Sequence, residues 1–128
     1  MFKWSALTIT QQKNVTRTVE YTFLIFLFIF YFMWAWNQPF NSAPDEKMRY
    51  DIPKYIYEHG SLPHGGEPEI RDENWGISYA FNPILSYMFA ALFMKVTSFF
   101  TTDAFALLVA ARTVSVIWGV LTAYFTIK

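Results

Sequence analysis

Two neighbouring carboxylates, Asp45 and Glu46, are the candidate catalytic residues of this chain, and Arg49 and Tyr50 follow closely. Asp45 and Arg49 lie four residues apart, so on a helix they share a face and either pair or turn together toward a ligand. A helix N-terminus stabilises an ionised carboxylate, which suits a general base. The pattern predicts proton transfer at Asp45 and leaves open a divalent cation beside Asp45 and Glu46. The structural alternative is a pair of ordinary first-turn acids.

Local signals place these acids at the start of a helix. Ser42 and Asp45 have the spacing of an N-terminal capping pattern, and Pro44 suits the first turn because its missing N–H would have no partner there. Gly60 is a favourable terminator. We therefore predict a helix over residues 44–59.

The predicted helix has an apolar face. Pro53 predicts a kink, because proline removes one backbone hydrogen bond. Apolar residues recur at helical spacing at Met48, Ile52, Tyr55 and Ile56. This stripe could lie on a bilayer surface or against other helices.

The composition favours a membrane protein. Of 128 residues, 54% are hydrophobic and 21% aromatic, whereas only 16% are charged. Cysteine is absent, which excludes disulfides and thiolate metal sites. No basic patch indicates a nucleic-acid partner.

The first apolar run is long enough to cross a bilayer. No charged residue occurs between positions 21 and 44, and about 20 apolar residues span the hydrocarbon core. We predict a first transmembrane helix over residues 19–38. A cleaved signal peptide is the alternative, but the run is long for one and lacks a small-residue cleavage site.

Charge asymmetry predicts the orientation. Lys13 and Arg17 precede the first span, so the positive-inside rule assigns residues 1–18 to the cytoplasm. Residues 39–80 then form an extracytoplasmic loop. We expect an integral protein of the plasma or inner membrane.

Two histidines in the loop raise the question of a metal. His59 and His64 lack the spacing of two ligands on one helix face, and acids nearby are commonly solvated. We therefore assign no metal ligands.

Two further apolar segments follow. Residues 81–100 are long enough to cross the membrane, but only a short polar turn separates them from the next segment, so they either span or lie partly embedded. Residues 104–127 predict a second transmembrane helix carrying one charge, Arg112. This cation either reaches the headgroups or faces the acidic site or a lipid phosphate.

The order of these features resembles the start of GT-C-type membrane glycosyltransferases, nearest the protein mannosyltransferase and aminoarabinose transferase group. The resemblance covers most of residues 20–128, and its strongest motif is P-D-E-x-x-R-Y at positions 44–50. Gly60, Asn82-Pro83 and Ala111-Arg112 follow in the expected order.

The resemblance implies a sugar donor on a polyprenyl phosphate and a catalytic acid in the first outer loop. By similarity, Asp45 is that acid and Glu46 its motif partner. The implied substrate- or phosphate-binding residues are Arg49, Tyr50, Lys95 and Arg112. Lys95 or Arg112 would have to replace the lysine of a Glu-Lys-Pro motif, where this chain has Phe-Asn-Pro at positions 81–83.

The resemblance also implies a fold. We expect an all-α membrane protein with two transmembrane helices, linked by an extracytoplasmic loop with two juxtamembrane helices, the second over residues 81–100. Because members of the group are several times longer, the resemblance predicts that the chain is an N-terminal fragment.

Other functions are open at this point. The chain could be a small non-enzymatic membrane subunit or adaptor whose acidic outer loop binds a partner. It could also be a transporter fragment in which Arg112 contacts the substrate. The expected partners are membrane lipid, a polyprenyl-phosphate sugar and an unidentified acceptor, and no nucleic acid.

Overall fold

The computed structural model describes residues 8–73, 76, 78–80 and 82–128, and this part of the chain is all-helical. It contains helices α1 (Ile9–Asn37), α2 (Glu46–His59), α3 (Ile84–Ser98) and α4 (Ala104–Ile127), with a short 3-10 helix, η2 (Pro68–Ile70). α1 and α4 are long and apolar enough to cross a membrane. The all-helical class and two candidate spans are thus confirmed. Residues 1–7 of the predicted cytoplasmic segment and Phe81 lie outside the described residues.

α1 begins ten residues before the predicted span of 19–38. Thr8 caps it, because its hydroxyl accepts the N–H of Gln11 while the Gln11 side chain accepts the N–H of Thr8. With no proline or glycine before Pro39, the polar first turns and the apolar run form one helix.

α2 begins at Glu46, two residues after the predicted start. The Ser42 hydroxyl donates to the carbonyl of Pro39 (2.8 Å) and does not cap the helix. Asp45 occupies the cap position with a left-handed backbone (φ 61°). Gly60 ends α2 with φ 66°, as predicted. The helix continues through the buried Pro53.

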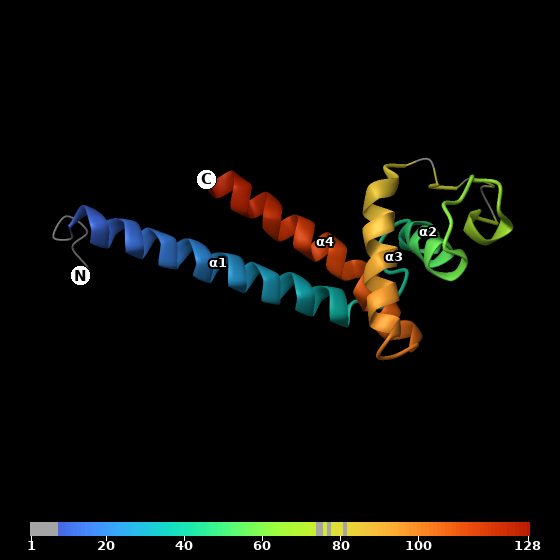
Figure 1. The fold of residues 1–128 in the computed structure, drawn as a ribbon, viewed down its shortest axis with the longest axis horizontal. Helices are drawn as coiled ribbons and strands as arrows, with labels where there is room; N and C mark the ends of the chain where they lie inside the picture. Colours follow the sequence, from blue (N-terminus) through green and yellow to red (C-terminus); the bar gives the residue numbers. More distant parts are fainter. Residues whose placement is uncertain (1–7, 74–75, 77, 81) are drawn as a thin grey trace.

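α3 runs across the end of the α1 and α4 pair, whereas α1 and α4 lie side by side and α1 extends beyond the end of α4 (Figure 1). α4 starts where the Asp103 carboxylate accepts the N–H of Ala106 (2.9 Å). At its far end, Lys128 donates to Glu20 of α1 (2.6 Å).

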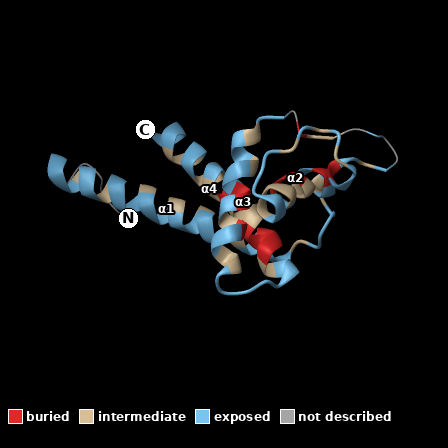
Figure 2. Cartoon of the chain, turned by 45° about the vertical axis from the view of Figure 1, so that its right-hand side comes forward, coloured by how far each residue is buried: buried red, intermediate tan, exposed pale blue. Residues whose placement is uncertain are grey.

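Buried residues gather where α3 crosses α4 and along α2, while α1 is exposed along most of its length (Figure 2). One cluster of buried residues joins α2, η2 and the segment before α3, and comprises Ile52, Ile70 and Ala80. A second cluster joins α3 and α4, and comprises Met94, Leu107 and Ala110. α2, α3 and the first turns of α4 therefore pack together at one end of the α1 and α4 pair.

Candidate functional site

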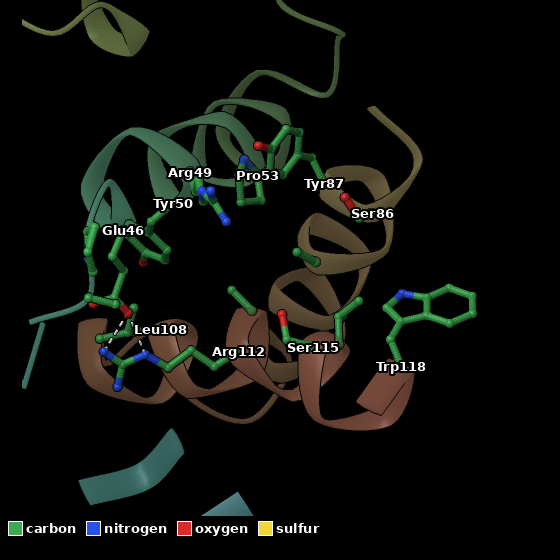
Figure 3. A pocket seen from close by; sticks show the side chains of 15 residues that line it. Glu46, Arg49, Tyr50, Pro53, Ser86, Tyr87, Leu108, Arg112, Ser115 and Trp118 are labelled. Atoms are coloured by element: carbon green, nitrogen blue, oxygen red, sulfur yellow. Dashed lines mark hydrogen bonds and ion pairs between the residues drawn. The ribbon is translucent and has the colours of Figure 1, made fainter. Parts of the chain in front are cut away.

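An open cavity of about 320 Å³ lies between α2, α3 and α4. Four of the six predicted site residues line it: Glu46, Arg49, Tyr50 and Arg112. The fold thus brings together residues that are more than sixty positions apart in the sequence. Figure 3 shows the guanidinium group of Arg49 and the hydroxyl of Ser115 directed into this cavity.

Arg112 is fully occupied by contacts within the protein. Its Nε donates to Glu46 Oε1 (2.7 Å), and its NH2 nitrogen forms an ion pair with the same oxygen. NH1 donates to the carbonyls of Ala35 and Gln38 (both 2.7 Å), and NH2 also donates to that of Pro39 (3.2 Å). A guanidinium has five N–H donors, so none is left for a phosphate.

These contacts correct our interpretation of Arg112. It points no free donor at a ligand, because its N–H groups are taken up by Glu46 and by the last carbonyls of α1, which have no partner within their own helix. The predicted alternative in which Arg112 faces the acidic pair is the observed one. Its side chain is only 12% exposed.

Glu46 is held from both sides. Its Oε1 accepts from Arg112, and its Oε2 accepts the backbone N–H of Asn41 (2.8 Å). The Glu46 side chain is 14% exposed. Glu46 therefore joins the loop before α2 to α4, and both of its carboxylate oxygens accept hydrogen bonds within the protein.

Asp45 and Arg49 do not form an ion pair in the described part of the chain; both contact Tyr79 instead. The Tyr79 hydroxyl hydrogen-bonds the Asp45 carboxylate, and this bond raises the pKa of Tyr79 above its ordinary value of 10.0. The guanidinium carbon of Arg49 lies 5.8 Å from the centroid of the Tyr79 ring, within cation–π range. Tyr79 therefore holds the acid and the cation on one side of α2.

Asp45 itself is exposed and adopts a backbone conformation that most side chains avoid. Its φ of 61° lies in the left-handed region, which aspartate and asparagine tolerate better than other non-glycine residues. Its side chain makes no cap hydrogen bond to α2. Asp45 flanks the cavity between two lining residues, Pro44 and Glu46, without lining it.

Tyr50 lines the cavity and also packs against the core. Its ring meets Phe40 edge to face (5.6 Å between centroids) and packs against the cluster around Met94. Burial raises the pKa of Tyr50, and the charges of Glu58 and Asp51 add to the effect. Its hydroxyl therefore stays protonated near neutral pH.

Lys95 lies apart from the other predicted residues. It lines a separate groove between α2 and α3, where its Nζ is 5.7 Å from the centroid of the Tyr57 ring. Of the two alternatives for a phosphate contact, Lys95 and Arg112, only Arg112 lines the cavity.

The described residues contain no group of three potential metal ligands among His, Cys, Asp and Glu. His59 is 3.7 Å from Glu69, and His64 is 3.3 Å from Glu67, in two separate pairs. With both oxygens of Glu46 engaged, Asp45 alone would remain for a cation at the first turn of α2.

Sequence reasoning missed several residues at the site. Tyr79 lies within the predicted extracytoplasmic loop of residues 39–80, and no spacing rule connects it to Asp45. Ser86, Tyr87 and Ser115 line the cavity from α3 and α4. Only the apolar setting of the two serines could have drawn attention to them.

No family model, curated protein or solved structure matches this chain. The resemblance to GT-C-type glycosyltransferases therefore stays a prediction from the motif at positions 44–50.

Proposed function

We propose that this chain forms part of an integral membrane glycosyltransferase that moves a sugar from a polyprenyl-phosphate donor to an extracytoplasmic acceptor. The observation that carries the proposal is the distribution of charge at the cavity. Arg112 and Glu46 satisfy each other. Among the described residues, Asp45 is left exposed and Arg49 has no carboxylate partner. One carboxylate and one cation are thus available to a ligand.

The two contacts between the ends of α1 and α4 support a placement of the bilayer between them. At 1.5 Å per residue, Glu20 to Gln38 spans about 27 Å and Arg112 to Lys128 about 24 Å. A hydrocarbon core is about 30 Å thick, and long charged side chains reach toward its edges. The basic residues early in α1 then lie in the cytoplasm, and the cavity lies at the outer surface.

In the proposed reaction, the acceptor hydroxyl or amine attacks the anomeric carbon of the donor while its proton passes to Asp45. A bond from the anomeric carbon to the acceptor forms, and the bond to the phosphate oxygen breaks. The polyprenyl phosphate leaves with the electron pair, and Arg49 stabilises its charge. General base assistance is worth about 10² to 10⁴ in rate.

The test compares two substitutions in the full natural protein, each of which removes one negative charge. Asp45→Asn keeps the size and the tolerance for a left-handed backbone but removes the base. Asp51→Asn removes a carboxylate of the same helix that instead pairs with Lys47 (2.9 Å). Membranes are supplied with a panel of radiolabelled polyprenyl-phosphate hexoses and pentoses, and loss of label from the lipid is measured.

We expect Asp45→Asn to reduce transfer by about 10² or more. Asp51→Asn should leave transfer nearly unchanged, because Asp51 does not line the cavity. Unchanged transfer by Asp45→Asn would refute its role as the base. Wild-type protein that consumes no donor in the panel would refute the function and favour a non-enzymatic membrane subunit.

A further inference from the structure

A second, larger hollow lies away from the cavity, between the C-terminal half of α2 and the outer face of α3. It is an open groove of about 750 Å³. Its α3 wall is a continuous apolar stripe at helical spacing, formed by Leu85, Met88, Phe89 and Leu92. These side chains are all exposed, from 38% at Phe89 to 59% at Leu85. A stripe of this kind that none of the described residues covers requires an apolar partner.

One cation stands at the end of this stripe. Lys95 follows Leu92 by three residues, so it lies on the same face of α3. In the described part of the chain, Lys95 forms no ion pair. Its Nζ lies 5.7 Å from the centroid of the Tyr57 ring. The acid of the groove, Glu58, is offset by Lys54 at 3.9 Å. The charge pattern is thus an uncompensated cation beside an apolar surface.

One residue of the groove, Phe89, contacts α4. Phe89 packs edge to face against Trp118 (6.1 Å between centroids). Trp118 follows Arg112 by six residues, or about 9 Å along the helix. With the bilayer placed as proposed above, Trp118 lies just beneath the outer surface. The Phe89 part of the groove then lies at the depth of the outer-leaflet acyl chains, whereas Lys95 lies near the C-terminal end of α3.

We propose that this groove binds an anionic phospholipid of the outer leaflet. An acyl chain lies along the stripe of α3, and the phosphate contacts Lys95. The inference rests on the membrane placement in the proposed function but not on glycosyl transfer. The polyprenyl phosphate carries the same chemistry, but Asp45 and Arg49 lie outside this groove, so we assign the groove to a phospholipid.

The experiment uses the full natural chain in nanodiscs of phosphatidylcholine with increasing phosphatidylglycerol, and counts the phosphatidylglycerol retained on the protein by native mass spectrometry. Lys95→Gln removes the cation. Lys47→Gln is the matched control, because Lys47 is an exposed lysine of α2 that pairs with Asp51, and neither residue lines the groove. Arg49→Gln tests the other cavity.

We expect Lys95→Gln to weaken retention about tenfold, the effect of losing one charged hydrogen bond. Lys47→Gln and Arg49→Gln should stay within about twofold, roughly the spread of surface substitutions. Equal retention by wild type and Lys95→Gln would overturn the proposal, as would displacement of phosphatidylglycerol by equimolar decaprenyl phosphate. Retention that depends on Lys95 in a protein without transferase activity would support the groove and refute only the proposed function.

Discussion

Two ion pairs lie at opposite ends of the α1 and α4 pair. They differ in exposure and in the number of polar groups that they satisfy. Lys128 and Glu20 meet at 2.6 Å with side chains 44% and 19% exposed. Arg112 and Glu46 are 12% and 14% exposed, and Arg112 also satisfies three carbonyls at the end of α1. The two ion pairs have the same formal charges, but the polar groups that lose their partners when each pair is removed differ. Loss of the Lys128–Glu20 pair leaves solvated groups, and loss of the Arg112–Glu46 pair leaves desolvated ones.

Arg112→Met should have the largest effect on stability. The substitution keeps an apolar stem but leaves the Glu46 carboxylate and three carbonyls without their donor. Breaking one partner of a buried pair costs about 3 to 5 kcal/mol. Equilibrium unfolding of the protein in mixed micelles measures this loss. A loss below about 1 kcal/mol, the range of exposed pairs, would contradict the structural role of Arg112.

Glu46→Gln should have a smaller effect. The amide oxygen can still accept from Arg112, but the amide nitrogen would face the N–H of Asn41, which now donates to Oε2. We expect a loss of about 1 to 3 kcal/mol in the same assay. Combined with Arg112→Met, the loss should be less than the sum, because the two residues share one interaction. Additive losses would mean that the pair is not coupled.

Lys128→Met removes the exposed pair and serves as the control for Arg112→Met. Because the Lys128 side chain is 44% exposed, we expect only a small loss of stability, and this loss shrinks as salt is added. A salt-independent loss as large as that of Arg112→Met would mean that the two ion pairs contribute equally to stability, which would contradict the comparison.

A third carboxylate extends the comparison to a group held by backbone donors. Glu67 accepts the N–H groups of His64 (2.7 Å) and Gly65 (2.8 Å), and these bonds lower the pKa of Glu67 below its ordinary value of 4.5. A lowered pKa means that the turn is stabilised above pH 4.5 and loses this contribution as the pH falls through the folded value. The amide chemical shifts of His64 and Gly65 should titrate below pH 4.5 in the wild type and not in Glu67→Gln. Titration above pH 4.5 would be inconsistent with these bonds.

Local sequence signals predicted most of the helices. The uncharged run after Glu20 and the apolar run after Asp103 predicted two long helices because burial in a bilayer needs length and apolar side chains. Gly60 ended α2 as expected, since glycine adopts a left-handed backbone without strain. The start of α2 was missed by two residues, because Asp45 takes the left-handed conformation that ordinary capping rules do not anticipate.

The site could be predicted only in part. The residue types on α2 indicated its chemistry, but pairing choices depended on long-range packing. Glu46 rather than Asp45 meets Arg112, across 66 positions of sequence. Tyr79 approaches Asp45 from a loop with no periodic pattern. Lys95 is separated from the cavity because α3 presents it to a different face.

Which side of the membrane carries Asp45 decides whether a transferase site can exist there. The chain has no cysteine, so single cysteines at the exposed positions Ser61 and Thr10 can be labelled with a membrane-impermeant maleimide in intact cells. We predict that Ser61→Cys is labelled from outside, and that Thr10→Cys is labelled only after the cells are permeabilised. Labelling of Thr10→Cys in intact cells, or protection of Ser61→Cys until permeabilisation, would contradict the account.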